Sequence, residues 1–180
     1  AHKHGLKHLV FGYIGRGHRE TADILKATAE RANKAAEECL AAGIQLCYHN
    51  HSFEFAKMDG DKTGFDIFIE QFDKNMKFEL DVFWVAIGGW DPLQTMQRLD
   101  GRISQLHLKD LKDDTPTNFD EGKVPHDAFK EVGSGRLDFA KIIQLGHKIG
   151  VQQCHVEQDQ SPSPLDSIAK SHEFLEKLEA

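Results

Sequence analysis

The stretch YHNHSFEF, residues 48–55, places two histidines on either side of an asparagine, directly after the apolar run IQLC. A strand that only packs a core has little use for two imidazoles at its end. Because side chains alternate along a strand, His49 and His51 project to one side and Asn50 to the other. The two imidazoles are therefore predicted to serve one site, as metal ligands or proton-transfer groups.

Polar residues of similar chemistry also follow the later apolar runs of the chain. They are Asp81, then His107 with Lys109, then Glu157 with Asp159. The first intervals match one βαβ unit of about 30 residues, so equivalent points on successive strands should converge. Two imidazoles and two carboxylates brought together suit Mn²⁺, Co²⁺, Zn²⁺ or Mg²⁺, with open positions for substrate oxygens. No cysteine takes part, which disfavours a structural zinc site.

Each of these residues also has a simpler explanation. A single acid after a strand is usually a cap or turn residue, which applies to Asp81 and Asp110. Glu157 could form only a salt bridge, and Trp84 could be either an apolar wall for a sugar ring or a packed core residue. The GSG at 133–135 lacks the spacing and lysine of a phosphate-binding loop and is predicted to be a turn. The joint occurrence at four strand ends favours the metal site.

Short apolar runs alternate with longer amphipathic stretches along the chain, which predicts a repeat of strands and helices. These elements must position the polar residues. Strands are expected at Leu9–Ile14 and in runs beginning at Ile44, Lys77, Ile103 and Gln152. Helices are expected at 21–42 before Gly43, around 65–72, from Asp91-Pro92, after Asp138, and from about Pro164. The polar stretch 112–125 is predicted to be a long loop. In a parallel barrel the carboxyl ends of the strands form one rim, where active sites lie.

Composition limits the class of protein and of partner. With 180 residues, 39% hydrophobic and 28% charged, the chain is predicted to be one globular domain, 1–180. A net charge of −7 and the lack of a Lys/Arg block disfavour nucleic acid and anionic membranes as partners, which favours a small molecule. No apolar stretch reaches about 20 residues, and the start lacks a signal-peptide cleavage site. A cytoplasmic location is expected, or a periplasmic one if an N-terminal segment has been removed.

Five motifs of the chain are familiar as a set. They are YHNHSFEF, ELDVFWVAIGGWDP, RISQLHLKD, EVGSGRLDF and HVEQDQSPSPLDSIAKSHEFL. In order and spacing they resemble the sugar phosphate isomerase/epimerase family, which has a xylose isomerase-like TIM barrel. The resemblance implies a divalent metal at the top of the barrel and chemistry on a sugar or keto-sugar. It makes Asp81, His107 and Glu157 metal ligands, Glu157 also a candidate acid/base, and Lys109 and Trp84 substrate contacts.

The YHNH stretch departs from the family pattern. Characterised ketose epimerases of this family have a glutamate ligand on this strand that also moves the proton, and the best equivalent here is His49. Epimerisation by two glutamates is therefore in doubt, whereas an asymmetric proton transfer next to a carbonyl, with His51 or Glu157 as base, fits the residues. Asn50 and Glu54 are predicted substrate contacts. The prediction is a metal-dependent sugar isomerase or epimerase, with a keto-sugar lyase or dehydratase as the alternative.

The length departs from the family as well. A complete eight-stranded barrel takes about 250 residues, and the strands here match the family's last five. The predicted fold is thus an α/β parallel barrel with about five βα units, whose open sheet exposes two unpaired edges. We therefore expect a homo-oligomer, or association with a chain that supplies the missing strands. Two rival interpretations are a non-catalytic sugar-binding or assembly fragment and an endonuclease IV-like DNA repair enzyme, which the net charge disfavours.

Overall fold

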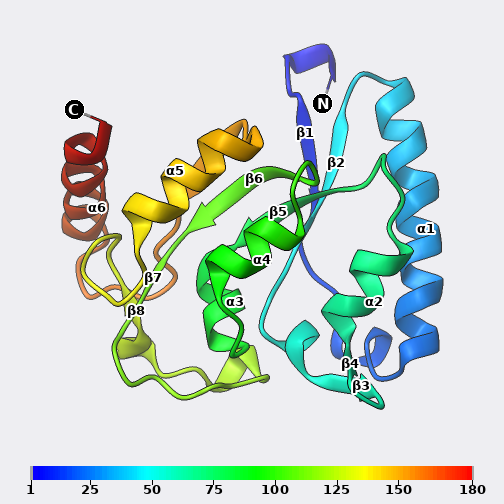
Figure 1. The fold of residues 1–180 in the computed structure, drawn as a ribbon. Coiled ribbons are helices and arrows are strands. Elements are labelled where there is room, and N and C mark those ends of the chain that lie inside the picture. The colour runs from blue at the N-terminus through cyan, green and yellow to red at the C-terminus, as the bar shows by residue number, and fades with distance from the viewer. Residues whose placement is uncertain (1, 180) are drawn as a thin grey trace.

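The computed structural model describes residues 2–179, and its centre is a curved sheet of five parallel strands that forms a half barrel (Figure 1). The strands are β1 (His8–Phe11), β2 (Gln45–His49), β5 (Lys77–Asp81), β6 (Ile103–Leu108) and β9 (Gln153–Val156). They lie in the order β1-β2-β5-β6-β9, and each neighbouring pair is parallel. The prediction of an incomplete parallel barrel is confirmed.

Helices and short hairpins connect the strands. The helices are α1 (Ala22–Ala41), α2 (Gly64–Gln71), α3 (Val82–Ile87), α4 (Pro92–Arg98), α5 (Phe139–Ile149) and α6 (Pro164–Glu179). The hairpins pair β3 (Lys57–Asp59) with β4 (Lys62–Thr63), and β7 (Asp110–Leu111) with β8 (Phe129–Lys130). Single 3₁₀ turns lie at His2–His4, Arg16–His18, Phe53–Phe55, Glu121–Lys123 and His126–Ala128. No helix within residues 2–179 is both long and apolar enough to cross a membrane.

The helix boundaries follow the predicted capping residues. Asp91 accepts a hydrogen bond from the Gln94 N–H, with proline at the first helical position of α4. Asp138 caps α5 in the same way, and Gly43 has the positive φ expected just beyond the end of α1. Helix α3 was not predicted, because its apolar sequence continues that of β5.

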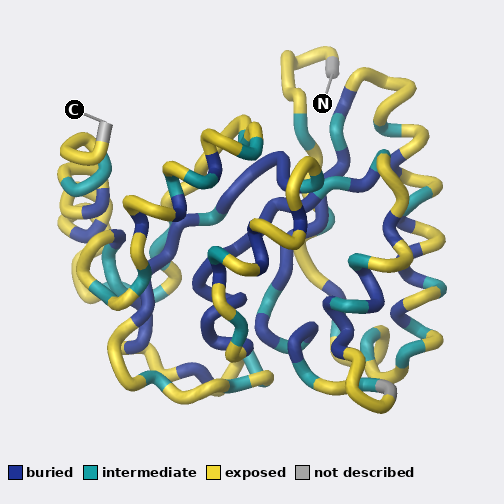
Figure 2. The backbone as a smooth tube through the Cα atoms, in the orientation of Figure 1, coloured by how far each residue is buried: buried dark blue, intermediate teal, exposed yellow. Residues whose placement is uncertain are grey.

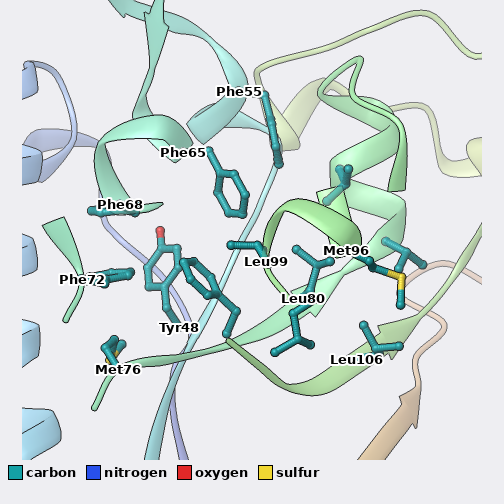
Figure 3. Packing of buried hydrophobic residues seen from close by; sticks show 14 of the residues in the cluster. Tyr48, Phe55, Phe65, Phe68, Phe72, Met76, Leu80, Met96, Leu99 and Leu106 are labelled. Carbon is teal, nitrogen blue, oxygen red and sulfur yellow. The ribbon is translucent and has the colours of Figure 1, made fainter. Parts of the chain in front are cut away.

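The hydrophobic core lies between the outer face of the sheet and the helices (Figure 3). Alternate residues of β2, β5 and β6 point into it, because strand side chains alternate between the two faces. They are Leu46, Tyr48, Phe78, Leu80, Leu106 and Leu108. The other alternate positions carry polar or small side chains: Cys47, His49, Glu79, Asp81, Gln105 and His107. The concave face of the half barrel is therefore polar, unlike the helix-covered face.

The two end strands approach each other at the base of the half barrel. The His8 Nε2 on β1 lies 3.1 Å from the Gln152 Oε1 just before β9, although β1 and β9 are at opposite ends of the sheet. Strands β2, β5 and β6 are mostly buried, as Figure 2 shows, whereas all of β9 is exposed. Burial on both faces, which is typical of parallel strands, is therefore seen for the central strands only.

Candidate metal centre

Three strand ends place two imidazoles and one carboxylate around one point. His49 ends β2, Asp81 ends β5, and His107 lies opposite Asp81 in the register of β6. The Asp81 Oδ2 is 3.9 Å from the His49 Nε2 and 3.8 Å from the His107 Nδ1. One ligand atom from each residue lies within 4.8 Å of the other two, a spacing that suits a divalent ion.

The two oxygens of Asp81 have different environments. Its Oδ1 accepts a hydrogen bond of 3.0 Å from the Trp84 N–H and so caps α3. The Asn50 side chain holds the Asp81 backbone at both its N–H and its carbonyl. Oδ2 is fully buried and has no hydrogen-bond partner, although the Lys109 Nζ lies 3.2 Å away. The Lys109 ammonium offsets part of the cost of burying this oxygen, and a metal ion between Asp81, His49 and His107 would supply it with a direct ligand bond. The residues therefore fit a metal ion.

Glu157 and Lys109 border this point. The Glu157 Oε2 lies 2.8 Å from the His107 Nδ1 and 2.8 Å from the Lys109 Nζ. Lys109 is only 2% exposed and is also within 3.0 Å of the Asp159 carboxylate. Burial alone would lower the pKa of Lys109, but the surrounding carboxylates raise it above its ordinary value. Lys109 is therefore a buried cation beside the predicted ligands.

His51 and Trp84 form the adjoining wall. The ring of His51 lies 4.9 Å from that of His49 and 5.5 Å from that of Trp84, measured between centroids. Burial, followed by the nearby His49, lowers the pKa of His51 to about 4, so this imidazole is neutral at neutral pH. Trp84 belongs to a small apolar cluster, and the Lys109 Nζ lies 5.4 Å from its ring centroid.

Asn50 and Glu54, the other two predicted site residues, contact protein groups. The Asn50 side chain bonds the Asp81 backbone. The Glu54 carboxylate, 1% exposed, accepts hydrogen bonds from the Tyr48 hydroxyl at 2.6 Å and from the His51 N–H. Burial raises the pKa of Glu54 to about 8 despite these hydrogen bonds. Both side chains support the strand ends, and a direct contact with substrate stays a prediction.

Glu79 is a site residue that the sequence reasoning missed. It precedes Asp81 by two positions on β5, so it faces the same side of the sheet, and it is 4% exposed. Its Oε1 lies 3.0 Å from the His107 Nε2 and 3.3 Å from the His49 Nδ1. Burial would raise the pKa of Glu79, but its close contacts with the His107 and His49 imidazoles lower it to about 2. A glutamate within an apolar strand, in step with Asp81, was the available signal.

Glu79 and Glu157 both act on the charge of His107. Burial would lower the pKa of His107, but the hydrogen bonds with Glu157 and Glu79 raise it to about 10. Without a metal, His107 is thus an imidazolium that holds these carboxylates together. A divalent cation bound beside Asp81 would displace the proton on Nδ1 and take over its charge.

A second group missed by the sequence reasoning joins two loops beside His51. Glu121, in the long loop after β6, accepts hydrogen bonds from the Tyr13 hydroxyl at 2.6 Å and from the Arg19 Nη2 at 2.7 Å. The Tyr13 ring lies 5.2 Å from the His51 ring, and the Arg19 guanidinium lies 3.7 Å from the Phe53 ring centroid. These contacts hold the loop after β1 and the 112–125 loop against the residues that follow β2.

A family model places this arrangement among known proteins. The model that matches residues 1–178 describes a xylose isomerase-like TIM barrel. The chain belongs to this family. Solved structures agree with the fold: a sugar phosphate isomerase/epimerase from Parabacteroides distasonis superposes with a TM-score of 0.80 at 24% identity, covering 95% of this chain and 59% of that one.

Three further similar proteins have a named chemistry or a bound metal. An inosose dehydratase from Geobacillus kaustophilus is 27% identical over 161 residues, which is 81% of this chain and 50% of the relative. The inosose dehydratase of Clostridium perfringens is 24% identical over 163 residues, 84% of this chain and 54% of the relative. The IOLI protein, solved with a zinc atom, superposes with a TM-score of 0.71 at 15% identity, covering 97% of this chain and 63% of that one.

The chain spans about half the length of the curated relatives it matches. The family model and the superposed structure together confirm the resemblance to sugar phosphate isomerases and epimerases at the level of family and fold.

Proposed function

We propose that this chain provides the metal-binding half of an enzyme that removes a proton next to the carbonyl of a keto-sugar, with dehydration as the favoured outcome. The observation that carries the proposal is the convergence of His49, Asp81 and His107 around the unsatisfied Asp81 Oδ2. Buried Lys109 and Glu157, both within ion-pair distance of this group, supply further polar contacts. The charge of the chain offers no comparable basis for a nucleic-acid substrate.

The metal would be held by His49, Asp81 and His107, with Glu157 completing the set. A divalent ion bound here supplies Lewis acidity, which polarises a substrate carbonyl and acidifies the neighbouring C–H bond. Of the four candidate ions, Zn²⁺ and Co²⁺ are favoured by the two imidazoles, whereas Mn²⁺ and Mg²⁺ suit the carboxylates. An open cavity of about 600 Å³ between the two end strands reaches the site, where Glu79, His107 and Glu157 form part of its lining.

The proton-transfer groups on the two sides of this point are chemically unlike. Glu157 is a half-exposed carboxylate, whereas His51 is a neutral imidazole against Trp84. Elimination uses such a pair: one group takes the C–H proton, and a second group protonates the departing hydroxide, so that water leaves and a double bond forms. Epimerisation by two equivalent carboxylates would need a second glutamate where the chain has His49. The names of the inosose dehydratases support the same choice.

Isomerisation or epimerisation is the second candidate. It shares the first proton transfer and differs only in where the proton returns, and the Parabacteroides distasonis neighbour is called a sugar phosphate isomerase/epimerase. Reaction in D₂O distinguishes the two outcomes. Isomerisation or epimerisation returns a solvent deuteron to carbon and keeps every heavy atom of the substrate, whereas dehydration removes one water.

The test uses protein dialysed against chelator and reloaded with Mn²⁺, Co²⁺ or Zn²⁺. Incubation with an inosose and, separately, with ketohexoses in D₂O is followed by NMR and mass spectrometry. We expect metal-dependent loss of water from the inosose, and its absence in Asp81→Asn and His107→Ala. A wild-type chain that holds no divalent ion, or variants that hold as much as wild type, would contradict the metal-dependent function. Metal binding without turnover would favour the sugar-binding or assembly fragment.

The two end strands of the sheet, β1 and β9, have unpaired edges that further strands could complete. Strand β9 is exposed throughout, and Leu9, Val10 and Val156 on the end strands are 48%, 37% and 40% exposed. Exposed apolar edge strands pair readily with further strands. We propose that additional βα units, from the same polypeptide or from another chain, complete the barrel here. Size-exclusion chromatography with light scattering tests this, and a stable compact monomer with full activity would contradict it.

A further inference from the structure

We propose that Glu79 is a positioning residue that orients both metal-binding imidazoles through a single carboxylate oxygen, so that His49 presents Nε2 and His107 presents Nδ1 to the ion. The inference rests on the proposed metal site and adds to it the ligand atoms and the residue that selects them. Glu79 lies on β5, two residues before Asp81, with its carboxylate on the same face of the sheet.

The two nitrogens of each ring have different neighbours. The Glu79 Oε1 lies 3.0 Å from the His107 Nε2 and 3.3 Å from the His49 Nδ1. The remaining nitrogens, His107 Nδ1 and His49 Nε2, are the ones that lie 3.8 and 3.9 Å from the Asp81 Oδ2. Each imidazole therefore has one nitrogen toward Glu79 and the other toward the Asp81 Oδ2, and the His107 Nδ1 is also 2.8 Å from the Glu157 Oε2. A metal-binding histidine commonly donates its second N–H to a carboxylate, which fixes the ring and its tautomer.

Glu79 has one further polar neighbour on the concave face. The His155 Nε2 lies 4.0 Å from the Glu79 Oε2 and 2.7 Å from the Gln105 Oε1, and Gln105 faces Glu79 in the register of β6. The Glu79 side chain is 4% exposed and lines the cavity beside the site. The His49 contact is the longer of the two and lacks the geometry of a formed hydrogen bond, since its Nδ1 has no hydrogen-bond partner. We expect this contact to shorten when His49 binds an ion.

An alternative arrangement makes Glu79 a ligand, with the ion bound by the His49 Nδ1 and the His107 Nε2. Two observations favour the positioning role. The converging group of ligand atoms consists of His49, Asp81 and His107, without Glu79. The Asp81 Oδ2 also has no hydrogen-bond partner, whereas the Glu79 carboxylate already has the His107 ring within 3.0 Å. The two arrangements predict opposite ligand nitrogens, so an experiment can separate them.

The first measurement is ¹⁵N NMR of the zinc-loaded wild-type chain with labelled histidine. We expect the Nε2 of His49 and the Nδ1 of His107 to carry the metal-bound signature, with a protonated nitrogen on the opposite side of each ring. Ligation through the His49 Nδ1 and the His107 Nε2 would overturn the proposal. This measurement needs no variant, so it remains decisive even where a Glu79 substitution prevents folding.

The second measurement is the dissociation constant for Zn²⁺ or Co²⁺, obtained by competition with a chromophoric chelator. Glu79→Gln should weaken binding by about 10–100-fold and alter the Co²⁺ visible spectrum, because the rings lose their charged acceptor. The matched control is Glu30→Gln, the same substitution on the exposed face of α1, which should stay within about 3-fold of wild type. Equal affinities for wild type and Glu79→Gln, or an equal loss in Glu30→Gln, would overturn the proposal. If the metal binds through the expected nitrogens and Glu79→Gln weakens it, but no sugar is turned over, the proposed function fails and the positioning role of Glu79 stands.

Discussion

Asp81 and His107 face each other across β5 and β6, with the Asp81 Oδ2 3.8 Å from the His107 Nδ1. Strand pairing alone therefore brings a carboxylate and an imidazole to the same level of the half barrel. Asp81 is also the N-cap of α3, so one side chain both begins a helix and faces the metal site. The two functions use different oxygens of the carboxylate, and substitutions can separate them.

The first prediction concerns the two oxygens of Asp81. Asp81→Asn keeps an oxygen for the Trp84 N–H but removes the anionic ligand, so metal affinity should fall by at least about 10-fold. Asp81→Ala should lose the metal equally and also lower the free energy of unfolding by about 1 kcal/mol relative to Asp81→Asn, because the cap is lost. Metal content after dialysis and urea denaturation of the metal-free variants measure the two effects. Equal stability of the two variants would exclude a capping role.

The second prediction concerns Asp110, which organises the GSG turn. Its two oxygens accept hydrogen bonds from the backbone N–H groups of Leu111, Gly133, Gly135 and Leu137. Asp110→Asn replaces one acceptor oxygen with a donor, which leaves buried N–H groups facing N–H, so we expect a loss of about 2–4 kcal/mol in unfolding free energy. Chemical denaturation measures it. Asp113→Asn, in the exposed part of the following loop, is the control and should change stability by less than about 0.5 kcal/mol.

The strand-end residues of the site were predictable because parallel strands bring equivalent positions to one rim, which requires only approximate strand positions. Asp110 was predicted to be a cap or turn residue, whereas it lies in β7 and its carboxylate binds the backbone of a turn that begins at Gly133, a contact that its place after a strand does not indicate. Asp81 fitted both of its interpretations at once, since it is a cap and also a candidate ligand. The cap residues Asp91 and Asp138 were predictable for a different reason, because capping depends on local sequence alone.

Other parts of the site depend on contacts that the sequence does not show. The run VFWVAI after Asp81 is apolar throughout, so it has the composition of a strand, yet it forms the buried helix α3, which Asp81 caps. The role of Glu79 depends on which alternate set of β5 side chains faces the concave side. The contact between Tyr13 and Glu121 joins residues separated by 108 positions, and no local pattern indicates it.

The third prediction concerns that contact between loops. Glu121→Ala removes the acceptor shared by Tyr13 and Arg19 and leaves the nine-tenths-buried guanidinium without its carboxylate. We expect a loss of about 1–3 kcal/mol in unfolding free energy and faster amide exchange across 112–125. Hydrogen exchange with mass spectrometry measures the second effect. Lys123→Ala, in the same 3₁₀ turn but with its side chain 76% exposed, is the control, and equal exchange rates in both variants would refute the role of Glu121.

The fourth prediction concerns pH and the buried Glu54. Burial raises the pKa of Glu54 from 4.5 to about 8, so the folded state binds its proton more tightly than the unfolded state does. Its contribution to stability is therefore complete below about pH 4.5 and is lost as the pH rises to about 8. Glu54→Gln removes this titration and retains an oxygen for the Tyr48 hydroxyl and the His51 N–H.

The stability of Glu54→Gln relative to wild type should thus increase between about pH 4.5 and 8, with a slope of up to about 1.4 kcal/mol per pH unit, and level off above that range. Urea denaturation of the metal-free proteins at several pH values measures the difference, with Glu30→Gln on the exposed face of α1 as the control for loss of a carboxylate. A difference that stays constant across this range would show that Glu54 is ionised in the folded protein, held by Tyr48 and the backbone more strongly than burial opposes it.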